Sequence, residues 1–118
     1  REIYRLLRDI PWIERPIVLD RPHHILSKRS VEQFLKLNPI SERTYVAEEF
    51  DCDNFAFRTF TDFKDWCPLG SYGIVIGPTH AWNMFLMSED NELKLIFVEP
   101  QNNNMFSRTD EVVRYAII

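Results

Sequence analysis

The sequence lacks the features that mark several broad protein classes. No apolar run approaches the roughly 20 residues of a membrane-spanning helix, and the first residues do not resemble a cleavable signal peptide. Lysine and arginine are dispersed in a chain of formal charge -4, which disfavours a phosphate-binding surface. We therefore expect a soluble protein that partners neither membrane nor nucleic acid. Because the first residue is arginine rather than methionine, we also expect that the chain begins inside a longer or processed protein, and its localisation stays open.

Internal repeats, low-complexity tracts and linkers are also absent. The chain has 118 residues, of which 45% are hydrophobic and 14% aromatic, enough for one packed core. We predict a single domain over residues 1–118.

Cysteine is scarce, and the spacing of the two cysteines argues against a disulfide. If residues 51–66 are helical, the 15 steps from Cys52 to Cys67 span about 22 Å at about 1.5 Å per residue. A disulfide needs Cα atoms within about 7 Å of each other. Cys67 is therefore interpreted as a buried thiol at a helix end, and Cys52 needs a separate explanation.

Two short helices are predicted in the first third of the chain. Apolar residues at helical spacing precede Pro11, which predicts a first helix followed by an extended arm. Ser30 and Gln33 form a capping-box pattern, which predicts a second helix over residues 30–37. Residues 41–50 are expected to form a loop or a helical turn.

A third helix is predicted to begin at Cys52, with Asp51 as its N-cap. Apolar side chains recur at helical spacing from Ala56 to Phe63, and Pro68 ends the pattern. The positive end of a helix dipole lowers the pKa of a thiol, which is one way to make a nucleophilic thiolate. The neighbouring carboxylates of Asp51 and Asp53 raise that pKa, so the sign of the net shift stays open.

Strand-like stretches follow at residues 71–77, 80–87 and 93–99, and residues 110–118 are typical of either a strand or a short helix. Helices followed by a meander of strands indicate an α+β fold. We predict N-terminal helices, a helix that starts at the cysteine, and then an antiparallel sheet.

The register of the second hairpin can be tested by arithmetic, because facing residues of an antiparallel pair have a constant sum. Pairing His80 with Glu99 puts three apolar pairs on the same side: Trp82 with Phe97, Met84 with Leu95, and Leu86 with Leu93. The implied turn at Glu89 and Asp90 is unfavourable, so a longer loop or a slip of two stays open. A slip of two still leaves His80 and Glu99 on one face.

A thiol at a helix start, beside a histidine with a carboxylate neighbour, is the arrangement of a cysteine nucleophile with an oriented general base. In such a site His80 accepts the proton of Cys52, and Glu99 holds the imidazole in the required tautomer.

This order of residues resembles the papain-like and transglutaminase-like superfamily. More closely, "FDCDNFA", "THAWNMFL" and "FVEPQ" resemble motifs of the agglutinin C-terminal family, the protease domain of a mushroom lectin, and of related microbial and phage domains. The similarity covers about residues 45–101. It implies a reduced papain-like fold and a calcium-dependent cysteine protease (a hydrolase of peptide or isopeptide amides) with Cys52, His80 and Glu99 as its catalytic triad. Carbohydrate binding does not carry over, because no lectin module is present.

Further residues are candidates for this site. Gln101 has the parity of Glu99 and is a candidate donor to an oxyanion or a substrate. Asn83 is a second such candidate, although its opposite parity favours a role in capping backbone groups on the far face. Asp51 and Asp53 offer the oxygen ligands that calcium prefers, and their alternative role is in capping the helix.

Two functions follow from different classes. The first is a cysteine hydrolase that acts on a peptide or protein through a thioester at Cys52. The second is a non-catalytic binding or structural module, associated with a phage particle or another chain. The enzyme needs the sulfur of Cys52 within reach of a His80 nitrogen, beside an open cleft. Since the chain is short, a partner chain or a second copy is expected to complete such a cleft.

Overall fold

The computed structural model describes residues 2–19, 23–107 and 112–118. Three α-helices occur in this part of the chain: α1 (Glu2–Arg8), α2 (Lys28–Leu37) and α3 (Cys52–Trp66). A short 3-10 helix, η1 (Pro39–Glu42), follows α2. The strands are β1 (Ile13–Ile17), β2 (Tyr72–Ile76), β3 (Ala81–Glu89), β4 (Glu92–Glu99), β5 (Asn104–Phe106) and β6 (Val113–Ile117).

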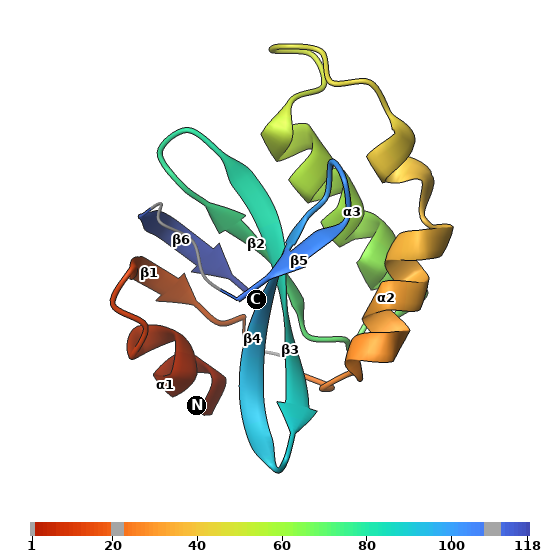
Figure 1. Cartoon of the computed structure of the whole chain (residues 1–118). Helices are drawn as coiled ribbons and strands as arrows, with labels where there is room; N and C mark the ends of the chain where they lie inside the picture. Colours follow the sequence, from red (N-terminus) through yellow and green to blue (C-terminus); the bar gives the residue numbers. More distant parts are fainter. Residues whose placement is uncertain (1, 20–22, 108–111) are drawn as a thin grey trace.

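The strands form one sheet in the order β1-β6-β2-β3-β4-β5 (Figure 1). The predicted α+β class is confirmed, but the sheet is mixed rather than wholly antiparallel, because β1 pairs in parallel with β6. The segment predicted as an extended arm is thus an edge strand. The stretch left open as strand or helix contains β6, which pairs with β1 and β2.

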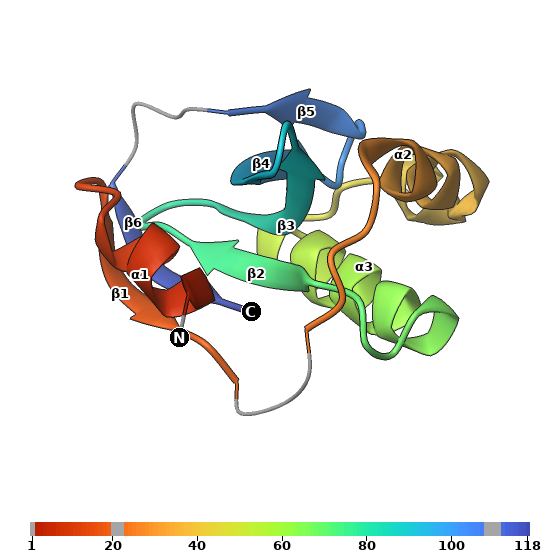
Figure 2. The same cartoon turned by 90° about the horizontal axis from the view of Figure 1, so that it is seen from below.

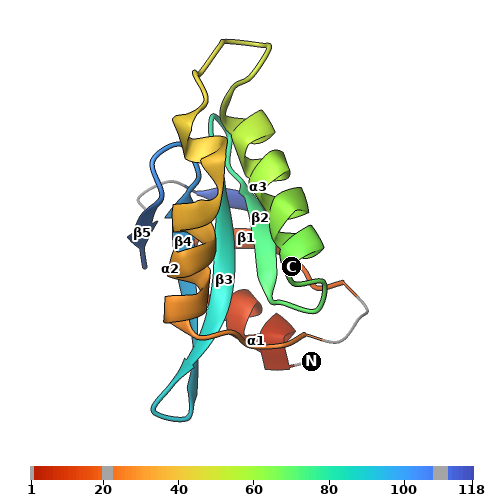
Figure 3. The same ribbon diagram turned by 90° about the vertical axis from the view of Figure 1, so that its right-hand side faces the viewer.

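The helices cover both faces of the sheet. On one face α2 and α3 run side by side over β3 and β2, as Figure 3 shows, and bury an aromatic core that includes Phe34, Phe63 and Tyr72. On the other face α1 packs Leu7 against a second core that includes Trp82 and Met84. Figure 2 shows α1 on the side of the sheet away from α3. Alternate residues of β3 therefore belong to different cores.

Local hydrogen bonds set the starts of two helices. The predicted start of α2 at Ser30 is wrong, because Ser27 is the N-cap and its Oγ accepts the Ser30 N–H at 3.1 Å. The prediction for α3 is confirmed, with Asp51 as N-cap and Cys52 as first residue. Asp51 and Asn54 form its capping box, in which the Asp51 N–H donates to Asn54 Oδ1 at 3.1 Å.

The β3–β4 register differs by two from the predicted one. Met84 faces Phe97 and Leu86 faces Leu95, because the turn consists of Asp90 and Asn91. Both turn residues have positive φ, 53° and 62°, a conformation that aspartate and asparagine tolerate better than most residues. The alternative of a slip of two is therefore the correct one, and the apolar ladder stays on one face.

Candidate functional site

Cys52 lies at the start of α3, against the end of the β2–β3 hairpin. Its half-buried side chain packs on a small apolar cluster formed by Ala56, Ile74 and Ala81. Ala81 is the first residue of β3 and directly follows His80. The α3 start and the β3 start thus meet at Cys52. Both cysteines are free thiols, as their spacing predicts.

The environment of Cys52 answers the question left open by its sequence. Burial raises the pKa of the thiol most, and the carboxylates of Asp51 and Asp53 raise it further. The backbone amide of Ala81 opposes them by favouring the thiolate, but the net pKa is above the ordinary value. Cys52 is therefore a protonated thiol near neutral pH in this structure.

His80 and Glu99 form a short hydrogen bond at the same end of the sheet. The distance from His80 Nε2 to Glu99 Oε2 is 2.5 Å. The other carboxylate oxygen of Glu99 accepts the Gln101 N–H at 3.2 Å. The imidazole also stacks on Trp82, with ring centroids 5.4 Å apart. When Nε2 carries the proton, Nδ1 is left as an acceptor for a ligand or a thiol.

The thiol and the imidazole approach the end of the sheet from opposite faces. Cys52 packs with Ala81 on the α3 face. His80 stacks on Trp82, whose side chain belongs to the core on the α1 face. No hydrogen bond joins Cys52 to His80 among the described residues. The arrangement therefore brings the predicted residues to one end of the sheet without assembling a hydrogen-bonded thiol and imidazole pair.

Asn83 is fully buried and does not face solvent. Its Nδ2 donates to the carbonyl of Ala56 at 2.9 Å and to that of Gly73 at 3.1 Å. Both amide hydrogens are thus used inside the protein, which leaves none for an oxyanion or a substrate. Gln101, by contrast, is half-buried in the turn that follows Glu99.

Asp51 and Asp53 interact with each other and with the first turn of α3. A hydrogen bond between the two carboxyl groups raises the pKa of Asp53 and lowers that of Asp51. Asp53 Oδ1 also accepts the Asn54 N–H at 3.1 Å. Within residues 2–19, 23–107 and 112–118, no group of three or more acidic, histidine or cysteine side chains could hold a metal ion. The alternative role in capping is the one their contacts display.

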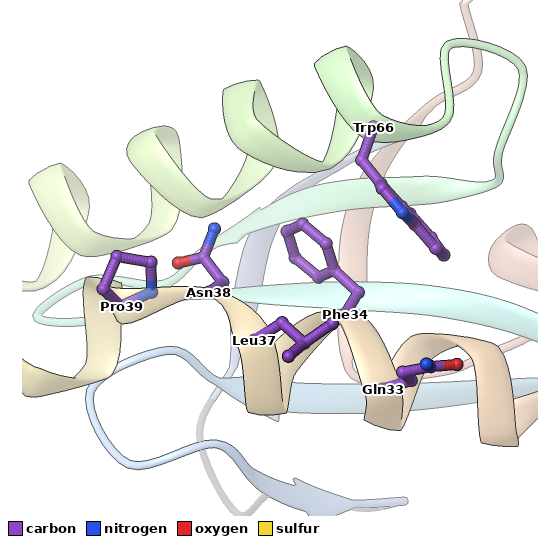
Figure 4. A pocket seen from close by; sticks show the side chains of 6 residues that line it. All are labelled: Gln33, Phe34, Leu37, Asn38, Pro39 and Trp66. Atoms are coloured by element: carbon purple, nitrogen blue, oxygen red, sulfur yellow. The ribbon is translucent and has the colours of Figure 1, made fainter.

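A separate pocket, which the sequence did not indicate, lies between α2 and α3 and has a volume of about 320 Å³. Phe34 and Trp66 point into it from the two helices, with ring centroids 5.4 Å apart (Figure 4). Trp66 is half exposed although it lies on a helix with a buried apolar side. The pocket is lined by Gln33, Phe34, Leu37, Asn38, Pro39 and Trp66.

The described helices include none long and apolar enough to cross a membrane.

Comparisons with known proteins find structural similarity only. No family model and no curated protein matches the chain. A solved structure described as a complex of PSL1a with E64 matches with a TM-score of 0.87 and 19% identity, over 98% of this chain and 49% of that chain. The lectin of Polyporus squamosus, bound to the influenza-binding epitope Neu5Acα2-6Galβ1-4GlcNAc, matches with a TM-score of 0.83 and 19% identity, over 98% and 47%.

These findings correct the family expected from the motifs. The matching structures are named as PSL1a and as a lectin, and nothing in the comparisons points to a papain-like or transglutaminase-like protein. We therefore withdraw that assignment, together with the cysteine protease activity, the calcium dependence and the phage association that it implied. This chain spans about half the length of the structures it matches. The similarity shows that it shares their fold.

Proposed function

We propose that this chain is a non-catalytic binding domain, and that its ligand site consists of Cys52, His80 and Glu99, called here the thiol site, with Gln101 at its edge. The observation that supports the proposal best is the His80–Glu99 pair of 2.5 Å beside a half-buried thiol at one end of the sheet. These groups offer one acceptor nitrogen, one thiol and one carboxylate to a ligand at one end of the sheet.

Binding is favoured over turnover because the thiol is not activated. A thiolate is the nucleophilic form of cysteine, and both burial and the flanking carboxylates raise the pKa of Cys52. The imidazole that would accept its proton has no hydrogen bond to the thiol in the described part of the chain. A ligand would therefore find hydrogen-bonding groups rather than a prepared nucleophile.

The structural neighbours suggest which ligands to test first. One neighbour is described as a complex with E64, a peptide-like epoxide, and the other as bound to a sialylated trisaccharide. An epoxide also reports on the thiol, since it forms a stable bond to a cysteine that it reaches. We propose a peptide-like ligand for the thiol site and use the trisaccharide as the comparison.

The test measures E64 labelling by intact mass, together with the rate of iodoacetamide alkylation against pH. The variants are Cys52→Ala and His80→Ala, and Cys67→Ala serves as the control because Cys67 is the other half-buried free thiol. We expect slow labelling at Cys52, weaker labelling in His80→Ala, and unchanged labelling in Cys67→Ala. The rate of Cys52 alkylation should rise at a higher pH than that of an ordinary thiol.

Three results would overturn the proposal. Equal labelling of both cysteines, or trisaccharide binding that ignores Cys52→Ala and His80→Ala without any E64 adduct, would remove the thiol site. Cleavage of peptide amides that disappears in Cys52→Ala would show turnover and end the non-catalytic interpretation.

A further inference from the structure

Asn83 connects three elements around Cys52. It lies on β3, and its side-chain amide donates to a carbonyl of α3 and to a carbonyl of β2. The α3 carbonyl belongs to Ala56, one helical turn beyond Cys52. The β2 carbonyl belongs to Gly73, next to Ile74, which faces Asn83 across the two strands.

Apolar packing and hydrogen bonds both contribute to the position of the α3 start. The apolar contacts there come from Ala56, Ile74 and Ala81 and from the fully buried ring of Phe55. Such contacts are not directional. Hydrogen bonds are directional, and a buried amide that loses its partners pays a desolvation cost. The two bonds of Asn83 therefore hold α3 at one height and one angle over the β2–β3 hairpin.

We propose that Asn83 is a positioning residue that fixes Cys52 relative to His80 within the thiol site. The inference rests on the proposed function, since it assigns a role to Asn83 in that same site. Asn83 is three residues after His80 and bonds to the residue four after Cys52, so it links the strand that follows His80 to the helix that starts at Cys52. Because it is completely buried, it acts on a ligand only through these groups.

The test replaces Asn83 without leaving a large cavity. Asn83→Leu removes both donors, and it also removes Oδ1, which has no hydrogen-bond partner among the described residues. This limits the loss of stability, because an apolar group of similar size leaves no unsatisfied side-chain atom. Asn83→Ala is the second variant, in which the lost donors are combined with a cavity.

A matched control exists in the same chain. Asn103 also donates its Nδ2 to a helix carbonyl, that of Leu35 in α2, at 3.1 Å. Its φ of 62° suits glycine, so Asn103→Gly removes the side chain without backbone strain. Both changes remove an asparagine that joins a helix to the sheet region, but only Asn83 bonds to the helix that carries Cys52.

The readouts are the pH profile of Cys52 alkylation, the yield of the E64 adduct, and hydrogen exchange at the amides of residues 52–56. We expect Asn83→Leu to shift the profile, to lower the adduct yield at least tenfold and to speed exchange at residues 52–56. Asn103→Gly, at a comparable loss of melting temperature, should leave all three unchanged. Equal effects of the two variants, or no effect of Asn83→Leu, would overturn the inference.

The exchange measurement separates this inference from the proposed function. If His80→Ala leaves E64 labelling unchanged in the otherwise wild-type chain, the proposed function fails. Faster exchange at residues 52–56 in Asn83→Leu would then still support a positioning role at Cys52. Unchanged exchange would refute that role whatever the labelling result.

Discussion

The hydrogen bond between His80 and Glu99 makes the most direct prediction, tested with Glu99→Ala. This variant leaves the imidazole without its carboxylate and the Gln101 N–H without its acceptor. The His80–Glu99 bond is charge-assisted, but the two side chains are 30% and 17% exposed, so we take the lower end of the usual free-energy range for such bonds. It then contributes about 1.5 kcal/mol, and the backbone bond about 0.5 kcal/mol.

The expected loss of unfolding free energy for Glu99→Ala is therefore about 2 kcal/mol, or a fall of about 8 °C in melting temperature at about 4 °C per kcal/mol for a chain of this size. Glu99→Gln should lose about half as much, since its amide oxygen can still accept a hydrogen bond. Chemical denaturation and a thermal melt measure both values.

Asp62→Ala is the control for a lost carboxylate. Asp62 also has two donors, Asn38 Nδ2 at 3.0 Å and Arg58 Nε at 3.3 Å, but it lies away from the thiol site. It should leave E64 labelling of Cys52 unchanged, whereas Glu99→Ala should reduce it. A melting temperature of Glu99→Ala within about 1 °C of the wild-type value would mean a loss of unfolding free energy below about 0.5 kcal/mol. This result would refute a formed His80–Glu99 pair.

Three further predictions follow from named contacts. Gly73→Ala should lower the free energy of unfolding, measured by chemical denaturation, by about 1–3 kcal/mol or more, because the new Cβ would lie 2.2 Å from the carbonyl oxygen of Ile117. Gly77→Ala, whose Cβ would have its nearest neighbour at 3.3 Å, should lower it far less. Asp53→Asn should lower the pKa of Cys52, since it removes a charge that raises it, and an alkylation profile that stays in place or moves to higher pH would contradict this. Calcium should leave the melting temperature unchanged, because Asp51 caps the helix and shares a hydrogen bond with Asp53. A rise in melting temperature with calcium that disappears in Asp53→Asn would restore the metal interpretation.

Local patterns predicted the elements that hold the candidate site. The start of α3 was predictable because a cap residue, a helical repeat of apolar side chains and a terminating proline all agree there. The two hairpins were predictable because their strands are runs rich in apolar residues and are joined by short turns. Each of these signals lies within about 20 residues of chain, the range over which sequence patterns are most informative.

Other features were missed either because a strand pairs with a distant part of the chain or because two local alternatives were equally suitable. The parallel pairing of β1 with β6 joins the two ends of the chain, and neither strand carries a sign of its partner. The α2 cap was misassigned because Ser27 and Ser30 are both suitable caps, and the hydrogen bond from the Ser30 N–H to Ser27 Oγ decides between them. The register error came from the turn, where Asp90 and Asn91 both tolerate positive φ and make a two-residue connection possible.

Residue parity predicted the relation between the two sides of the candidate site only in part. It correctly put His80 and Glu99 on one face, and it indicated that Asn83 lies on the other. It did not indicate that α3 packs on the Asn83 face. Cys52 therefore meets the hairpin from the side opposite to the imidazole, and the two groups can meet only at the end of the sheet, beyond the last paired residues.

At Cys52, the packing of the helix start works against activation of the thiol. A helix start lowers the pKa of a thiol only while solvent and the amide ends remain near it. Here the same residue packs on Ala56, Ile74 and Ala81, and that burial is the largest cause of its raised pKa. The contacts that bury Cys52 at the start of α3 are thus the contacts that raise the pKa of its thiol. A ligand that displaced Cys52 from this cluster would weaken the packing and favour the thiolate at the same time, so ligand binding and thiol reactivity are coupled through the first turn of α3.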